Sequence, residues 1–301
     1  MSKRLKSLVR LAVLLAVGGV PWAWVQAPAS GASGLPPVPI PPDNPQSEAK
    51  IKLGAQLFFD TRLSADNTVS CATCHDPQTG WSTPHATDAG IKGQVGKRNS
   101  GNVINAAYMT FQFWDGRANS LEEQVKGPIS NPIEMGETLE HVVTKLNAIP
   151  GYRDQFKAVF GTEVTFDGIA KAIASFERTI VSGPSPYDRY LAGHKKAMSA
   201  AAVRGMGIFM GKAHCVSCHS GPLFSDQSFH NLGVGMDQPA PDLGREDVTK
   251  DPKDRGKFKT QGLRNVAQAG PYMHDGSKKN LHDVVDFYDD GGIKNPNPIR
   301  S

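Results

Sequence analysis

A pentapeptide with the pattern Cys-X-X-Cys-His occurs twice in this chain, and it restricts the possible folds more than any other feature. The first copy carries Cys71, Cys74 and His75, and the second carries Cys215, Cys218 and His219. This pattern is typical of c-type haem attachment, in which both cysteine sulfurs bond the porphyrin edge and the histidine ligates the iron. A zinc or redox Cys-X-X-Cys site leaves the two histidines unexplained. The sequence therefore predicts two covalently bound haem c groups.

The first thirty residues have the layout of a secretory signal. Four basic residues, the last of them Arg10, precede the uncharged run Leu11–Val25 and a stretch of small residues that ends at Ser30. The uncharged run is shorter than the ~20 residues that usually span a bilayer, which disfavours an uncleaved anchor. We therefore predict a signal peptide over residues 1–29, cleaved after Ala29, and a mature protein in the periplasm.

Charge and cysteine content exclude two other classes of protein. The four cysteines all lie inside the two motifs, so none is left for a disulfide. Of 33 Lys and Arg, four lie in the predicted signal, and the rest balance the 29 Asp and Glu. Nucleic-acid binding is not expected, because no clustered stripe of Lys or Arg is visible.

The mature length of about 270 residues suits two domains, one for each haem. We predict a mainly α fold with two cytochrome c-like domains, over residues 47–188 and 189–301, preceded by an extended lead-in over residues 30–46. The similar stretches Gly54–Phe58 and Gly205–Phe209 hint at a duplicated unit.

Apolar spacing and capping residues predict the main helices. The expected helices are residues 47–59, a helix capped by Ser199, a helix begun by the capping box Ser120–Glu123, one capped by Thr138, and a long helix with Phe166 to Ile180 on one face. No convincing series of strands is visible. The polar stretch Met236–Lys257 predicts a long surface loop.

Six further segments carry a family resemblance. They are Leu57–Ser64, Ser70–His75, Arg98–Ser100, Phe113–Arg117, Gly127–Pro132 and Gly270–Gly276. In this order they resemble the bacterial di-haem cytochrome c peroxidases and MauG, and the resemblance covers nearly all of the mature chain. It implies that His75 ligates a peroxide-reactive iron and that His219 ligates an electron-relay iron.

The resemblance also implies three catalytic residues. Trp114 matches the tryptophan between the two haems, Gln124 the distal glutamine and Glu134 the distal glutamate. A carboxylate over the reactive iron can take a proton from one peroxide oxygen and return it to the other, which heterolysis of peroxide requires. Without the resemblance, Glu134 would be interpreted as a loop acid, Gln124 as a solvated polar residue and Trp114 as a core anchor. The core and bridging roles of Trp114 are compatible.

Calcium between the domains is a further implication. Its ligands would be the Asn99 side chain and the main-chain carbonyls of Ala269 and Pro271. His274 would hydrogen-bond a haem propionate or hold the interdomain loop, and we do not expect it to ligate iron.

One departure from the peroxidase pattern concerns the reactive iron. Many relatives carry a displaceable histidine ligand eight residues before the position of Asn99, and here that residue is Ile91. His85 is the only nearby histidine, and it is displaced from the family position. We therefore expect an iron that is open to water or peroxide at rest, as in MauG.

The other departure concerns the second iron. Peroxidases of the family place a methionine ligand fourteen residues after the position of His274, whereas this chain has Tyr288 there, as MauG does. Asn280 can cap a helix on which Tyr288 shares an apolar face with Leu281 and Val284, so we expect the side chain to point into the interior. Met236 and Met273 do not stand at the family position.

The expected function is thus a di-haem c-type peroxidase that shares two oxidising equivalents of hydrogen peroxide between its haems. A small cytochrome c or cupredoxin would be the electron donor. The alternatives are a MauG-like oxidase that modifies a side chain of a partner protein and, disfavoured by Gln124 and Glu134, a cytochrome that only transfers electrons.

Overall fold

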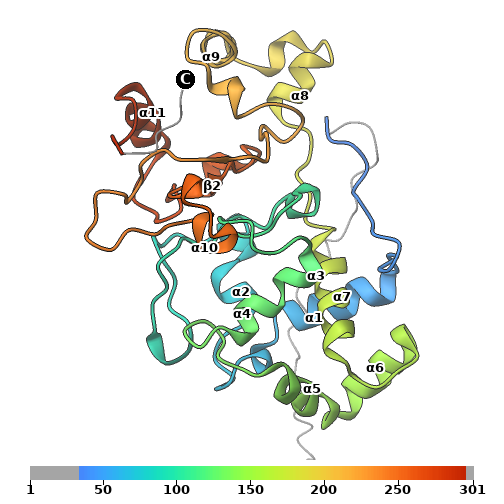
Figure 1. The fold of residues 1–301 in the computed structure, drawn as a ribbon. Helices are drawn as coiled ribbons and strands as arrows, with labels where there is room; N and C mark the ends of the chain where they lie inside the picture. The colour runs from blue at the N-terminus through green and yellow to red at the C-terminus, as the bar shows by residue number, and fades with distance from the viewer. Residues whose placement is uncertain (1–33, 296–301) are drawn as a thin grey trace, which may run out of the picture.

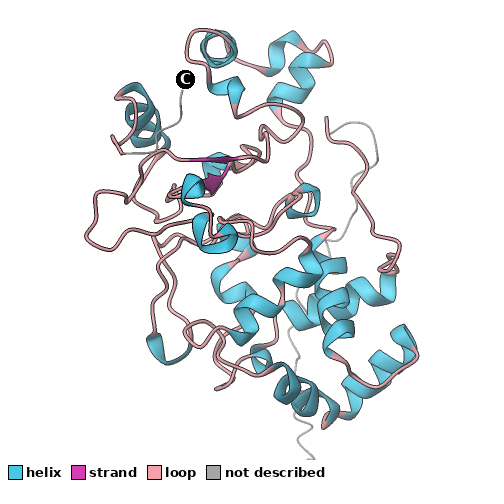
Figure 2. Cartoon of the chain, in the orientation of Figure 1, coloured by secondary structure: helices cyan, strands magenta, loops and turns pink. Residues whose placement is uncertain are grey.

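A computed structural model describes residues 34–295, and nearly all of its regular structure is helical (Figure 1, Figure 2). The predicted signal peptide lies outside these residues. None of the helices within residues 34–295 has the length and apolar composition needed to cross a membrane. The α-helices are α1 Glu48–Phe58, α2 Cys71–Cys74, α3 Leu121–Gln124, α4 Lys126–Ser130, α5 Leu139–Asn147, α6 Pro150–Phe160, α7 Phe166–Glu177, α8 Pro186–Leu191, α9 Ala200–Met210, α10 Glu246–Thr249 and α11 Leu281–Asp289. The strands β1 Phe229–His230 and β2 Phe258–Lys259 pair antiparallel.

Residues 34–188, the N-terminal half, contain the main hydrophobic core. Helices α1 and α7 cross at Gly54, where an added Cβ would lie 1.8 Å from the Ala172 carbonyl oxygen, so only glycine permits this approach. Leu57, Phe58 and Ile173 are fully buried in the contact. This core lies directly behind the first haem motif, because Cys71 packs against it.

Residues 189–295, the C-terminal half, bury far less apolar surface. Leu223, Val234 and Phe287 are its buried hydrophobic residues within the described chain. Helix α9 has no buried residue, and its Ile208 and Met210 are 46% and 40% exposed. The protein atoms alone therefore leave apolar faces around the second haem motif, which lies at the end of α9.

The predicted helix starts are confirmed at four positions. The side chains of Ser47, Thr138, Ser199 and Asn280 accept hydrogen bonds from the third residue after each of them, and α1, α5, α9 and α11 follow. The predicted capping box is half wrong, because Glu123 reaches back to the amide of Asn119 instead of that of Ser120.

Two other predictions need correction. Helix α7 ends at Glu177, so Ile180 is buried without being helical. The stretch Met236–Lys257 is not only a surface loop, because it contains α10 and packs on the N-terminal half. Its Arg245 donates from Nη1 to the carbonyls of Asp115 and Gly116 at 2.9 and 2.8 Å. Polar composition concealed these contacts because they are made by charged side chains.

An internal repeat with an offset of 160 residues relates segment 99–125 to segment 259–285. Asn105 and Asn265 both have positive φ, at 66° and 60°, and each precedes a short 3₁₀ helix. Phe113 and Met273 share the same left-handed backbone, at 66° and 70°. Both segments then close an isolated antiparallel bridge, Gln112–Ala118 and Tyr272–Lys278. The two segments therefore have the same local fold, and each leads into a helix, α3 or α11.

The two related segments meet where the halves of the chain contact each other. The amide of Asn99 donates to the His274 carbonyl at 2.7 Å, and the amide of Lys259 donates to the Trp114 carbonyl at 2.8 Å, so the bonds are related by the same offset. Arg98 adds a bidentate pair to Asp242, at 2.6 and 2.8 Å. These bonds fix Trp114 between the halves.

Candidate active site

The first Cys-X-X-Cys-His motif begins with α2, a single helical turn in which Cys71 packs against the main core and Cys74 is partly buried. Burial raises the pKa of Cys74 to about 12, with further contributions from the charges of Asp88 and Glu134. Burial also raises the pKa of Cys71. Thiols that react as redox centres have lowered pKa values instead. The environment therefore fits thioether attachment better than a redox or zinc site.

The two motif histidines lie in environments that suit metal ligation. His219 donates from Nδ1 to the Phe224 carbonyl at 2.9 Å, which leaves Nε2 for a metal. His75 has a buried Nδ1 with no hydrogen-bond partner among the described residues, and burial lowers its pKa. Both imidazoles therefore fit the neutral form that binds iron.

Glu134 lies close enough to the first motif for its charge to affect Cys74. Burial raises the pKa of Glu134, while a 2.7 Å hydrogen bond from Asn131 Nδ2 to its Oε1 and the charge of Arg117 oppose that rise. The Ile91 amide donates to the Glu134 carbonyl at 2.8 Å. A carboxyl group whose pKa is raised by burial can accept and return a proton more readily than an exposed one.

Gln124 and Trp114 have different degrees of support in the structure. The half-buried side chain of Gln124, at the end of α3, makes no hydrogen bond to the described residues. The indole of Trp114 donates from Nε1 to the Asn99 carbonyl at 2.8 Å, and its ring meets that of His274 edge to face at 6.5 Å. His274 is itself stacked on Phe258 at 3.6 Å. Three rings from both halves thus lie together.

The predicted calcium ligands have oxygen atoms without donors. Asn99 is buried and uses Nδ2 to donate to the carbonyls of His85 and Ala86, while its Oδ1 accepts no hydrogen bond from residues 34–295. The same holds for the carbonyls of Ala269 and Pro271. Amide and carbonyl oxygens are ligands that Ca²⁺ prefers, so this donor set fits the ion.

Ile91 and His85 stand in different environments. Ile91 is 5% exposed and belongs to the main core, where its Cδ1 packs against Gly136. His85 is exposed, and Asn99 binds its main chain. An apolar core residue thus takes the position of the displaceable histidine.

The position of Tyr288 corrects one expectation. Its side chain does not point into the protein interior: Tyr288 is 45% exposed, as are Val285 at 65% and Leu281 at 38%, while Phe287 is the buried residue of α11. Partial burial and, to a smaller extent, Cys218 and Cys215 raise the pKa of the Tyr288 phenol to about 12. The apolar face of α11 therefore turns toward the second motif. The periodicity identified this face correctly, but few protein atoms cover it.

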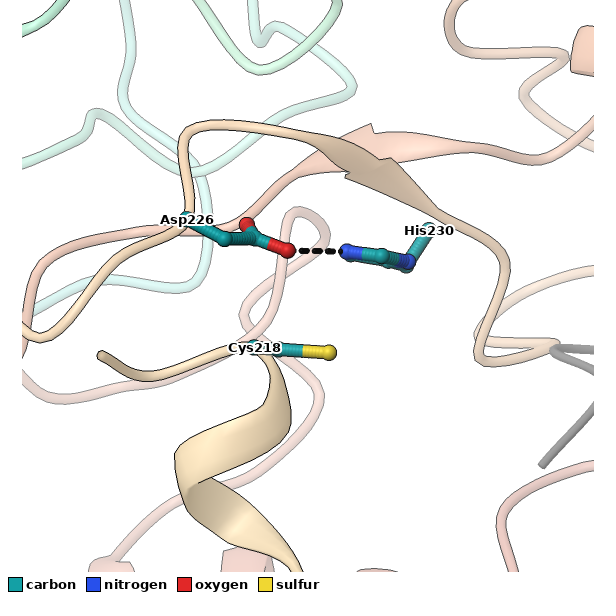
Figure 3. Close-up of side chains that lie close together, drawn as sticks. All are labelled: Cys218, Asp226 and His230. Carbon is teal, nitrogen blue, oxygen red and sulfur yellow. Dashed lines mark hydrogen bonds and ion pairs between the residues drawn. The ribbon is translucent and has the colours of Figure 1, made fainter.

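Cys218 also lies in a cluster with Asp226 and His230 that resembles a small metal site (Figure 3). The His230 ring and Asp226 are joined at 2.7 Å between Nε2 and Oδ2. A thioether bond to haem uses the Cys218 sulfur, so the remaining pair lies at the edge of the second haem site instead of forming a separate one.

Comparisons with known proteins agree with this geometry. The family model "Di-haem cytochrome c peroxidase" matches residues 48–196. Cytochrome-c peroxidase IdrP1 of Pseudomonas sp. (strain SCT) is 42% identical over 289 residues, covering 86% of this chain and 76% of the relative. The chain belongs to the di-haem cytochrome c peroxidase family. It is accordingly an oxidoreductase of a family that carries two haem c groups.

The relatives of this chain include proteins named cytochrome c peroxidase and proteins named MauG. Methylamine utilization protein MauG of Methylorubrum extorquens is 43% identical over 263 residues, with 86% of this chain and 74% of the relative covered. A crystal structure of a MauG-like protein associated with microbial copper homeostasis matches with a TM-score of 0.80 at 35% identity, over 87% of this chain and 82% of that one. Membership in the family therefore leaves the substrate open.

Three polar residues of this di-haem peroxidase were not predicted from its sequence. Asp88 and Glu177 each have a buried carboxylate oxygen without a hydrogen-bond partner in the described chain, and they lie near Cys74 and Cys71, respectively. Lys259 is buried between the halves. The 160-residue repeat is the sequence signal that could have identified Lys259, because it aligns Lys259 with Asn99.

Proposed function

We propose that this chain is a periplasmic peroxidase with two haem c domains, over residues 47–188 and 189–301, that reduces hydrogen peroxide at the first haem. The observation that carries the proposal is Glu134, a carboxyl group with a raised pKa beside the first haem motif. When bound, the haem irons supply the two electrons that, with two protons, convert hydrogen peroxide to two molecules of water.

Glu134 moves the proton that this reaction requires. Its partly desolvated carboxylate takes a proton from one peroxide oxygen and returns it to the leaving oxygen. Asn131 orients the carboxylate through the 2.7 Å bond, and the Ile91 amide holds its main chain. Gln124, whose side chain has no protein partner, donates a hydrogen bond to peroxide or to a bound water.

Trp114 couples the two haem sites. Its position between the halves, with hydrogen bonds to Asn99 and Lys259, supports this role. A Ca²⁺ ion held by Asn99, Ala269 and Pro271, whose oxygen atoms lack donors among the described residues, would join the two halves.

Tyr288 would ligate the iron of the second haem. Its place on the apolar face of α11, near Cys215 and Cys218, supports this assignment. A phenolate is a hard donor that favours higher oxidation states, whereas a thioether favours ferrous iron. The second haem would then share the oxidising equivalents of peroxide with the first.

The electron source distinguishes two versions of the function. A peroxidase takes electrons from a small cytochrome c or cupredoxin, whereas a MauG-like oxidase takes them from a side chain of a partner protein. Tyr288 and Ile91 favour the second version, because both depart from the peroxidase pattern. Steady-state oxidation of reduced cytochrome c by peroxide separates them, since a dedicated side-chain oxidase turns over this donor poorly.

Substitution of the proposed acid–base residue tests the proposal itself. Glu134→Gln should keep both haems and slow the reaction with peroxide by about 10²–10⁴-fold, the usual contribution of a positioned proton shuttle. Stopped-flow absorbance measures the rate, and Glu140→Gln, an exposed acid at the start of α5, is the control. An unchanged rate for Glu134→Gln would refute the proposed mechanism.

A further inference from the structure

Lys259 carries a buried ammonium group with no carboxylate partner. The residue is 5% exposed, and Nζ donates one hydrogen bond, to the Phe111 carbonyl at 2.9 Å. No ion pair involving Lys259 occurs among residues 34–295, and burial alone lowers its pKa to about 8. Burying a cation without a counter-ion costs stability, so packing does not explain why a lysine stands here.

The same residue holds both ends of the segment that carries Trp114. Its main-chain amide donates to the Trp114 carbonyl at 2.8 Å, and its ammonium binds Phe111, three residues earlier. The neighbouring Phe258 stacks on His274, which meets the Trp114 ring. Strand β2 thus contacts the His274 ring and the main chain of Trp114 between the halves.

The 160-residue repeat relates this arrangement to the proposed calcium site. Lys259 corresponds to Asn99, and Phe111 corresponds to Pro271. Asn99 binds the His274 main chain as Lys259 binds that of Trp114. The ammonium of Lys259 and the Phe111 carbonyl therefore occupy the places that the Asn99 side chain and the Pro271 carbonyl occupy in the other half.

We propose that Lys259 is a positioning residue that fixes Trp114 between the two haems. Its ammonium group is the cation at the position that the repeat relates to the proposed calcium site. The inference rests on the proposed function, because it assumes that Trp114 couples the haems. The ammonium restrains Phe111 and the amide restrains Trp114, so the indole keeps its place relative to both haem sites. The interaction contributes to electron transfer between the haems at the expense of stability.

A graded set of variants tests this inference. Lys259→Met removes the ammonium with little change of shape, and Lys259→Gln keeps a neutral donor. Lys257→Met is the matched control, since Lys257 is a neighbouring, partly exposed lysine that pairs with Asp254. Trp114→Phe reports the effect of losing the indole. For each variant we would measure haem content, melting temperature, and the rate at which the spectrum of the second haem responds to peroxide.

The expected result separates positioning from stability. Lys259→Met should keep both haems and a melting temperature no lower than wild type, because an unpaired buried charge is removed. The response of the second haem should slow by about 10- to 100-fold, the effect of a displacement of roughly 1 Å, with Lys259→Gln in between. Lys257→Met should respond at the wild-type rate.

Three results would overturn the inference. If Trp114→Phe is slow but Lys259→Met is not, Lys259 has no positioning role, and the proposed function stands. If Trp114→Phe also keeps the wild-type rate, the route through Trp114 fails, and the role of Lys259 fails with it. A slower response of Lys259→Met that merely follows a loss of haem or a lower melting temperature would indicate a structural role instead.

Discussion

Replacing Gly90 with alanine should slow the reaction with peroxide, because Gly90 packs directly against the main chain that carries Glu134. A Cβ atom built at Gly90 lies 2.1 Å from the Ile133 carbonyl oxygen and 2.6 Å from the Cα of Glu134. The backbone of Gly90, with φ −88° and ψ −155°, is extended and does not itself exclude alanine. The effect of the substitution is therefore steric, and it acts on the neighbouring main chain of residues 133–134.

The displacement can be derived from these distances. Ordinary van der Waals contact begins at 3.4 Å, so the segment 133–134 must move by about 1 Å. Such a misplacement of a catalytic group lowers rates by up to about 100-fold. The 2.8 Å bond from the Ile91 amide to the Glu134 carbonyl should weaken as well. Overpacking of this kind destabilises by about 1–3 kcal/mol, which leaves most domains folded.

Stopped-flow mixing of the oxidised protein with peroxide measures the effect. Gly96→Ala is the control, because it lies in the same loop and an added Cβ there meets nothing within 4 Å. We expect Gly90→Ala to react about 10- to 100-fold more slowly than both Gly96→Ala and wild type, with normal haem content. Equal rates for the two glycine variants would show that the reaction does not depend on the position of the Glu134 main chain beside Gly90, and would refute the reasoning.

Two further predictions concern resting ligation and pH. Since Ile91 is buried in the core, the fully oxidised enzyme should react with peroxide without prior reduction, and a lag removed only by pre-reduction would instead indicate a displaceable ligand such as His85. Burial raises the pKa of Glu177 to about 8, so the unfolded chain releases this proton at lower pH than the folded one, and stability falls as pH rises from about 5 to about 8. Glu177→Gln should therefore raise the melting temperature more at pH 8 than at pH 5, and an equal gain at both pH values would argue against a buried, proton-binding carboxyl group.

Local patterns in the sequence were enough to predict the helices that begin at a capping residue. Thr138, Ser199 and Asn280 were identified because a cap acts within three residues. The end of α7 at Glu177 was not predicted, since the apolar period continues to Ile180 although the helix does not. Burial at that position comes from tertiary packing, which a local period cannot distinguish from helix.

The candidate site divides in a similar way. The two haem motifs are contiguous and were evident from the sequence. Glu134 was identified only through a family resemblance, because nothing local distinguishes it from a loop acid. Lys259 and Asp242 escaped notice, since their partners Phe111 and Arg98 lie more than a hundred residues away in the chain.

The periodicity of α11 was read correctly, but its environment was not. Leu281, Val285 and Tyr288 do share one face, as the spacing predicts, and that face is exposed rather than covered by protein. A pattern of apolar residues predicts that a helix face is buried, but it does not show whether protein or a cofactor covers that face. In this half of the chain, a porphyrin fits that description better than a side-chain core.

Electron paramagnetic resonance of the oxidised protein, before and after one equivalent of peroxide, tests the central claim most directly. The account predicts one high-spin and one low-spin ferric haem at rest, with both signals lost after peroxide, and a changed low-spin signal in Tyr288→Phe. A near-infrared band typical of methionine ligation at rest, a response confined to one haem, or a Tyr288→Phe variant with the wild-type low-spin signal would contradict it.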